Sequence, residues 1–193
     1  RLVIAREIHE VFVDRLQARA EAMQLGHGLR DCGIGPVSSL AHRDRIAGYV
    51  NRARERGVRV RTGGQACADP QTGRGWFYPP TILDDLPAMD EAVQDEIFGP
   101  VLAVQVFDDL AQAVALANGT AYGLVAGVYT RSFAAAHQLA RDIDAGQIFI
   151  NEYFAGSIAV PFGGNRRSGF GREKGMEALR SYSRIKSVAA RIS

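Results

Sequence analysis

The chain has 193 residues, 47% of them hydrophobic and 23% charged, which suits one globular unit with a buried core and excludes a disordered or collagen-like chain. Its formal net charge is +2 and basic side chains alternate with acidic ones, so charge gives no case for nucleic-acid binding. Two cysteines are too few for a disulfide framework, and no apolar run reaches the roughly 18 residues of a membrane span. We expect a cytoplasmic protein that binds neither nucleic acid nor membrane.

The first half of the chain alternates between patterns typical of strands and of helices. Ser38 and Ser39 are candidate caps of the second predicted helix, and Gly57 ends it. The first predicted helix has an apolar face made of Ile8, Val11, Phe12, Leu16 and Met23. In chain order, the predicted elements are a strand over 2–5, helices over 6–23 and 40–56, and strands over 58–64 and 81–86.

The second half continues this alternation. Residues 101–107, VLAVQVF, are a nearly unbroken apolar run, which predicts a strand buried on both faces. Asp108 or Asp109 is the expected cap of the helix that follows, and Gly146 ends the next helix. In chain order, the remaining predictions are a helix over 109–120, a strand over 123–130, a helix over 131–146, a strand over 147–151, a helix over 175–182 and a strand over 184–192.

Strands that alternate with helices predict parallel βαβ units, and hence an α/β fold with helices on the faces of the sheet. Ligands of such sheets bind beyond the carboxyl ends of the strands. Asn151 lies at one of these ends, and the glycine-rich stretch 154–175 that follows is long enough to indicate a functional loop. The last strand, 184–192, is expected to complete a sheet edge, either its own or a partner's.

Several common site motifs are absent from the sequence. GIGPVS and GFGREK lack the third glycine of the dinucleotide-binding G-x-G-x-x-G, and no phosphate-binding G-x-x-x-x-G-K occurs. The four histidines are scattered without ligand spacing, so we expect no metal site. Neither Cys32 nor Cys67 has a neighbouring histidine or cation in a pattern that would activate a thiol.

The stretch QDEIFGPV, residues 94–101, places two acids and an aromatic ring before a Gly-Pro turn. With ALANGTAYGLVAGVYT, AGQIFIN, VPFGGNRRSGFGREKG and YSRIKSV in this order, the chain resembles the aldehyde dehydrogenase superfamily along its whole length. The resemblance implies an α/β fold, namely the parallel-sheet βαβ catalytic domain of an aldehyde dehydrogenase, truncated at its N-terminus. It implies that residues 1–181 are the C-terminal part of that domain and residues 182–193 a terminal oligomerisation strand.

The resemblance also implies a cofactor, NAD or NADP. Glu96 matches the acid that hydrogen-bonds the ribose hydroxyls beside the nicotinamide, and Phe98 matches the ring that packs against it. The chemistry agrees, because a carboxylate only accepts hydrogen bonds and an aromatic ring offers a flat apolar wall. The alternative is a charged start to a strand with Phe98 in the core.

Three further residues match substrate-binding positions of the family. Asn151 matches its asparagine at a strand end, and Phe162 matches a ring that lines the aldehyde tunnel. Phe154 or Tyr153 is expected to add to that wall. For Phe162 the alternative is packing as an anchor between Pro161 and the glycines. The loop offers no fixed cation, which favours an apolar or cationic aldehyde over a dicarboxylic semialdehyde.

The nucleophile of the family is a cysteine in a G-Q-x-C segment just before the strand that matches residues 2–5, so we expect no catalytic residue within this chain. Cys67 in GGQACAD lies after the second helix, and we interpret its similarity to that segment as coincidence. The resemblance implies the C-terminal part of an NAD(P)-dependent aldehyde dehydrogenase, inactive by itself, that forms a homo-oligomer through its last strand. The alternative is a non-catalytic module for subunit assembly or partner binding.

Overall fold

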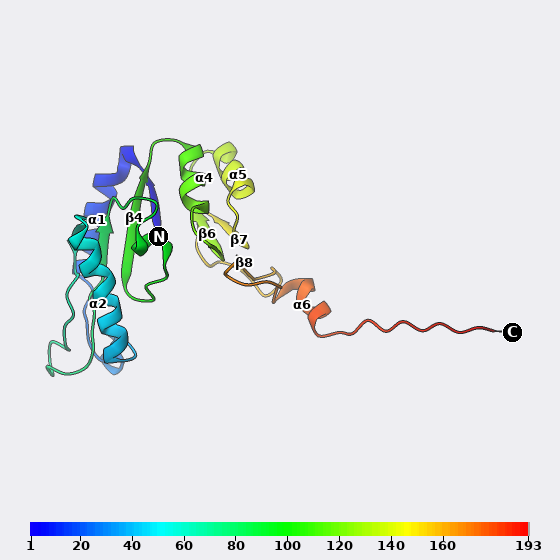
Figure 1. Ribbon diagram of the computed structural model, residues 1–193, viewed down its shortest axis with the longest axis horizontal. Coiled ribbons are helices and arrows are strands. Elements are labelled where there is room, and N and C mark those ends of the chain that lie inside the picture. Colours follow the sequence, from blue (N-terminus) through cyan, green and yellow to red (C-terminus); the bar gives the residue numbers. More distant parts are fainter. Residues whose placement is uncertain (193) are drawn as a thin grey trace. The chain divides into compact units, whose positions relative to one another are not determined.

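The computed structural model describes residues 1–192 and divides the chain into two compact units, Arg1–Gly119 and Thr120–Ser193. Each unit has its own strands and helices (Figure 1). Within residues 1–192, no helix is both long enough and apolar enough to cross a membrane.

The first unit is built on a four-stranded sheet of order β1-β4-β3-β2. β1, β4 and β3 run parallel, as the alternating pattern predicts. β2 runs antiparallel to β3, so the parallel arrangement expected from the sequence is wrong at this edge. The connection of residues 63–80 contains no helix, whereas the crossover between parallel strands is usually helical. The strands are β1 (Leu2–Ala5), β2 (Arg59–Thr62), β3 (Thr81–Asp84) and β4 (Val101–Phe107).

Helices pack on both faces of this sheet, with α2 in front of it and α1 behind it in Figure 1. Ile82 and Leu83 are neighbours on β3 and point to opposite faces, where Ile82 belongs to the core cluster of Val13 on α1 and Leu83 to that of Ile46 on α2. Burying each such side chain contributes about 1.5 to 3 kcal/mol. The helices are η1 (Arg6–Ile8), α1 (His9–Glu21), η2 (Gly28–Arg30), α2 (Leu40–Glu55), α3 (Glu91–Gln94) and α4 (Leu110–Asn118).

The predicted helix caps are confirmed. The Ser39 hydroxyl accepts a hydrogen bond from the His42 backbone N–H at 3.1 Å, and Asp109 accepts one from the Gln112 N–H at 2.8 Å. Each satisfies an N–H that has no partner inside its helix.

The predicted face of α1 is wrong at most of its positions, and of its five residues Leu16 is the one that packs, partly buried, against the core cluster on the sheet. The buried residues of the helix are His9, Val13 and Ala20, whereas Val11 and Phe12 are exposed. The apolar spacing indicated a helix correctly, but the face that packs on the sheet is set by the partners there, Ile82 and Val104 among them. His9 is therefore buried at a position that the hydrophobic pattern placed on the polar face of the helix.

The second unit contains a βαβ unit in which β6 (Val125–Val128) and β7 (Gln147–Ile150) pair in parallel and α5 (Phe133–Asp142) connects them. The glycine-rich stretch that was predicted as a loop contains a short strand, β8 (Asn165–Arg166), which pairs antiparallel with β5 (Tyr122–Gly123). The helix α6 (Gly175–Ser181) follows, close to the predicted range.

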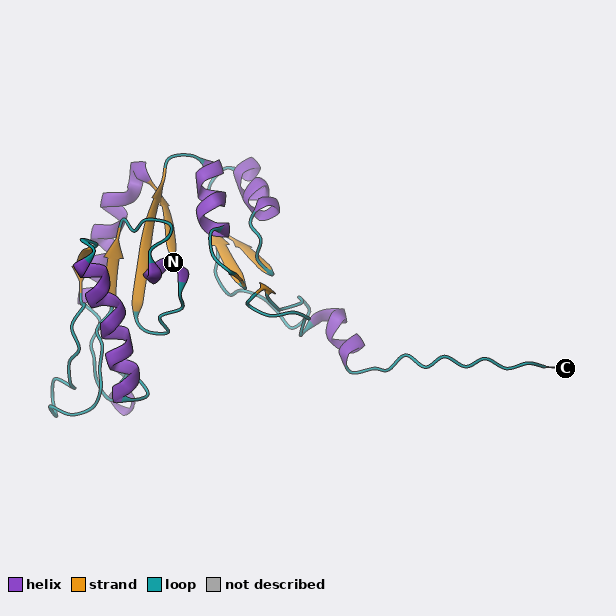
Figure 2. Ribbon diagram, viewed as in Figure 1, coloured by secondary structure: helices purple, strands orange, loops and turns teal. Residues whose placement is uncertain are grey.

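The strand predicted over 184–192 does not form within the described residues. Residues 183–192 make no strand pairing, and Figure 2 shows them as an extended loop. Ile185 and Ile192 are almost fully exposed. The segment therefore does not complete an edge of its own, and its pairing with another copy stays a prediction.

Tyr78 is expected to make the first unit sensitive to alkali. Its phenol is buried, and within residues 1–192 its hydroxyl has no hydrogen-bond partner. Burial raises the pKa of the phenol to about 12 against the weaker opposite effect of Arg54. An unfolded tyrosine ionises near pH 10, so between about pH 10 and 12 only the unfolded chain loses this proton. Ionisation of Tyr78 in the unfolded chain is therefore expected to lower the free energy of unfolding of the first unit by up to about 3 kcal/mol over that range.

Urea unfolding followed by circular dichroism at pH 9 and pH 11.5 measures this loss. Tyr78→Phe should lose less stability than the parent on going to the higher pH, and Tyr182→Phe, whose ring is exposed, should match the parent. Equal losses in the parent and Tyr78→Phe would show that Tyr78 does not titrate abnormally.

Candidate functional site

Glu96 and Phe98 lie on one loop, residues 95–99, between α3 and β4. Ile97 is 7% exposed and anchors the loop in the core cluster of α2. On either side of it, Glu96 is exposed and Phe98 is 69% exposed. Within the described chain, the Glu96 carboxylate has no hydrogen-bond partner. The alternative of a core phenylalanine at position 98 is therefore wrong, and the loop presents an acceptor and a ring together.

The turn that aims these two side chains is tight. Phe98 has a φ of 59°, in the left-handed region that bulky residues rarely adopt. A Cβ at Gly99 would lie 2.5 Å from Cδ1 of Ile46 on α2, so a larger residue there would have to displace this buried side chain for the turn to pack onto the helix. Such strained backbone is concentrated at functional sites, because the surrounding structure must hold it.

Asn151 follows β7 in the second unit, at the strand end where the sequence places it. Its amide oxygen accepts from the Thr130 backbone N–H at 2.9 Å, and its amide nitrogen donates to the Thr130 carbonyl at 3.0 Å. These bonds tie the end of β7 to the segment that follows β6. They use both polar atoms of the side chain, and a substrate-binding role for Asn151 stays a prediction.

The structure brings Phe154 and Phe162 together, with ring centroids 6.5 Å apart. Tyr153 contacts Phe154 edge-on at 5.0 Å, and Phe149, which the sequence reasoning missed, lies 6.1 Å from Phe154. Phe149 is buried on β7, whereas Tyr153 and Phe154 are largely exposed. Both of the rings that the sequence left as alternatives thus belong to one aromatic cluster.

Phe162 also contacts a cation and borders an open hollow. The Lys174 ammonium lies 5.4 Å from the centroid of the Phe162 ring, a cation–π contact that sequence spacing did not reveal. The hollow has a volume of about 400 Å³, and it is lined by Phe162, by Leu124 and by glycine-rich residues that follow Phe162 in the chain. A hollow of this volume is within the range of small-molecule sites.

Neither cysteine is prepared to act as a nucleophile. Burial raises the pKa of the Cys67 thiol, although the charge of Arg43 acts in the opposite direction. The backbone of Cys67 pairs with that of Phe77 in an isolated bridge. Cys32 is half-buried, with its sulfur 4.0 Å from the Arg30 carbonyl oxygen. A catalytic thiol needs a nearby base, and within residues 1–192 the contacts of these two thiols include none.

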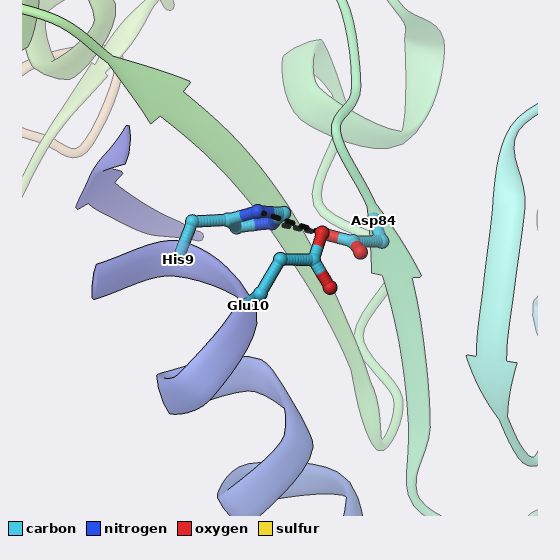
Figure 3. A group of neighbouring side chains, drawn as sticks. All are labelled: His9, Glu10 and Asp84. Carbon is cyan, nitrogen blue, oxygen red and sulfur yellow. Dashed lines mark hydrogen bonds and ion pairs between the residues drawn. The ribbon is translucent and has the colours of Figure 1, made fainter. Parts of the chain in front are cut away.

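One histidine does gather acidic neighbours, which sequence spacing missed. His9, Glu10 and Asp84 place potential ligand atoms within 4.8 Å of one another (Figure 3), with His9 Nε2 2.7 Å from Asp84 Oδ1. However, the Arg61 guanidinium lies 3.3 Å from the other Asp84 oxygen and 3.0 Å from Glu10. Because a cation already balances these carboxylates, we interpret the group as a structural network between α1, β2 and β3.

Comparison with known proteins gives one consistent family. The profile of the aldehyde dehydrogenase family matches residues 1–188. Betaine aldehyde dehydrogenase 1 of Rhizobium meliloti is 38% identical over 189 residues, which cover 97% of this chain and 39% of that protein. The 4-trimethylaminobutyraldehyde dehydrogenase A of Danio rerio is 37% identical over 191 residues, 97% of this chain and 38% of that protein. The chain thus spans about two fifths of the length of these relatives.

Solved structures show the same similarity. An NAD+ complex of aldehyde dehydrogenase from Bacillus cereus has a TM-score of 0.91 and 35% identity, covering 99% of this chain and 38% of that one. A point mutant of betaine aldehyde dehydrogenase from Staphylococcus aureus, in complex with NAD+, has a TM-score of 0.87 and 32% identity over 93% of this chain and 37% of that one.

Proposed function

Because the chain belongs to the aldehyde dehydrogenase family, we propose that it supplies part of the site of an NAD(P)-dependent enzyme that oxidises an aldehyde to a carboxylic acid. The observation that carries this proposal is the loop 95–99, where a tight turn holds an exposed ring and a carboxylate that has no partner among residues 1–192. Since the chain spans 39% of the Rhizobium meliloti relative, the activity of the whole protein is part of the proposal.

Glu96 and Phe98 fit a nicotinamide nucleotide chemically. The Glu96 carboxylate, which has no partner in the described part of the chain, can accept hydrogen bonds from two vicinal ribose hydroxyls, and the exposed Phe98 ring can cover one face of a planar heterocycle. When bound, the nicotinamide supplies the acceptor for the hydride that leaves the substrate. The role of this chain is to hold and orient the nicotinamide ring. The NAD+ complexes of the two solved relatives favour NAD over NADP.

We assign neither Cys32 nor Cys67 as the nucleophile of this reaction, since burial raises the pKa of the Cys67 thiol and no base contacts Cys32 in the described chain. The contribution of this chain is therefore binding rather than covalent chemistry. The alternative, a module without catalytic function, is weaker because Glu96 and Phe98 would then be held in a strained turn for no purpose.

The aromatic cluster supports an apolar or cationic aldehyde. Tyr153, Phe154 and Phe162 offer ring faces, on which both apolar groups and quaternary ammonium ions bind. The Lys174 ammonium already occupies one side of Phe162, so a cationic substrate would use the exposed rings of Tyr153 and Phe154. A lower kcat/KM with betaine aldehyde than with a dicarboxylic semialdehyde would contradict this proposal.

We also propose that the protein is cytoplasmic and that its copies associate through residues 182–193. The exposed apolar side chains of Ile185, Val188 and Ile192 support association. Sedimentation velocity on the full-length gene product, with and without this segment, tests it, because an unchanged mass distribution would remove the segment from the interface. Fractionation of the source cells tests the location.

Glu96→Gln in the full-length gene product is expected to lower kcat/KM for NAD by about 10- to 100-fold. The change keeps the shape of the side chain but removes the charge, and hydrogen bonds to charged groups contribute about 1.5 to 3 kcal/mol. Steady-state kinetics with varied NAD and a saturating aldehyde measure the effect.

Glu7→Gln is the matched control, since Glu7 is an exposed acid of the same unit outside the loop. It should retain the kinetics of the parent. Parent-like kinetics in Glu96→Gln would exclude Glu96 from the cofactor site, and a gene product without dehydrogenase activity would exclude the proposed function as a whole.

A further inference from the structure

One face of α2 makes a series of hydrogen bonds to the loop 95–99. The side chains at positions 42, 45 and 49 are spaced by three and four residues, which places them on the same face of the helix. The Tyr49 hydroxyl donates to Asp95 Oδ2 at 3.0 Å, and the Arg45 guanidinium donates to the Glu96 carbonyl at 3.3 Å. One turn earlier, His42 Nε2 lies 2.7 Å from the Phe98 carbonyl oxygen. The loop therefore runs antiparallel to the helix and contacts three successive positions of one face.

His42 makes the shortest of these contacts, and a second hydrogen bond, on the opposite nitrogen of its ring, holds the ring in place. A carbonyl oxygen only accepts, so Nε2 of His42 must carry the proton that bonds to Phe98. In neutral histidine Nδ1 is then an acceptor, and it lies 2.9 Å from the Ser38 hydroxyl, which can donate to it. The backbone N–H of His42 is held by Ser39. The ring is thus fixed at the start of α2.

The Phe98 carbonyl belongs to the residue whose backbone is strained. With a φ of 59°, Phe98 keeps this conformation only while its surroundings hold it, and the hydrogen bond from His42 acts on the same residue. Releasing the carbonyl lets the backbone relax toward negative φ, and that rotation redirects the ring and the neighbouring Glu96.

We propose that His42 is a positioning residue for the cofactor contacts of Glu96 and Phe98, and that it acts by donating from Nε2 to the Phe98 carbonyl. The expected effect on kinetics rests on the proposed function. The expected effect on the loop rests only on the contacts of α2. Arg45 and Tyr49 hold the first half of the loop, and His42 holds the half that carries the ring.

The test compares His42→Ala, His42→Gln and Arg43→Ala in the full-length gene product. Glutamine keeps an N–H donor on a side chain of similar reach, whereas alanine removes it. Arg43 is the control, because it is on the same helix and pairs with Asp44, and among residues 1–192 its hydrogen bonds do not reach the loop. Hydrogen exchange of residues 95–99 reports the loop directly, and kcat/KM for NAD reports the cofactor contact.

We expect His42→Ala to speed amide exchange in the loop and to lower kcat/KM for NAD by about tenfold, the worth of one hydrogen bond. His42→Gln should restore most of both effects, and Arg43→Ala should change neither. Unchanged exchange in His42→Ala, or no restoration by glutamine, overturns the inference. If exchange rises but the kinetics do not change while Glu96→Gln is impaired, the positioning role is overturned. If Glu96→Gln is also unimpaired, Glu96 is excluded from the cofactor site, and the positioning role of His42 for that contact is overturned with it. A gene product without dehydrogenase activity excludes the proposed function, and hydrogen exchange alone then decides whether His42 holds the loop.

Discussion

Replacing Gly146 with alanine is expected to cost about 3 kcal/mol of unfolding free energy in the second unit, the upper part of the usual range for overpacking. A Cβ at this position would overlap the Gly163 carbonyl oxygen. The backbone of Gly146 cannot move away easily, because its N–H donates to the Gly123 carbonyl at 3.0 Å. Gly163 follows Phe162, so the displacement should reach the aromatic cluster.

Hydrogen exchange of residues 122–128 and 162–166 measures this effect without contribution from the first unit. Gly156→Ala is the matched control, since a Cβ there would meet its nearest side-chain atoms at an ordinary distance of 3.8 Å. It should leave protection within about 0.5 kcal/mol of the parent. If Gly146→Ala were as stable as Gly156→Ala, the close approach between Gly146 and Gly163 would be absent from the protein in solution.

Arg61→Met is expected to cost about 3 to 5 kcal/mol in the first unit. The Arg61 side chain is 5% exposed and contacts carboxylates of Glu10, Asp14 and Asp84. The Asp84 side chain is 1% exposed, so the substitution leaves a buried charge whose other partner is His9. Methionine keeps much of the volume, and the loss therefore measures the unpaired charge rather than a cavity.

Arg59→Met provides a matched control two residues earlier on the same strand. Arg59 is 62% exposed and lies 3.9 Å from an equally exposed Glu10, so its loss should cost less than about 1 kcal/mol. Fluorescence of Trp76, the single tryptophan of the chain, follows unfolding of the first unit in urea. The double variant Arg61→Met with Asp84→Asn should recover much of the stability. A double variant as unstable as the sum of the two single changes would show that the charge pair is not the cause.

This second prediction also bears on the group in Figure 3. A metal site would need His9 and Asp84 free to coordinate an ion, whereas here Asp84 is shared between His9 and Arg61. Sequence spacing could not indicate this network, because His9 and Asp84 are 75 residues apart and Arg61 is 23 residues from Asp84. It arises from strand register, which sets Arg59 opposite Asp84 and brings β2 beside α1.

The sequence by itself determined the local structure and the family of this protein. Hydrophobic spacing located the principal helices and most of the strands, and Ser39 and Asp109 marked helix starts, because capping depends on residues only three positions apart. The order of motifs such as QDEIFGPV indicated an aldehyde dehydrogenase, the family that the profile and the relatives show. The cofactor and substrate roles of individual residues remain predictions.

Only the tertiary structure decided which side chains are buried and which distant residues meet. The apolar pattern of α1 could not show that Val13 packs on the sheet while Phe12 stays exposed, since burial depends on the neighbours that cover a face. Likewise, His42 reaches Phe98 across 56 residues of sequence. Such contacts are set by how helices and strands pack together, and local periodicity carries no information about that packing.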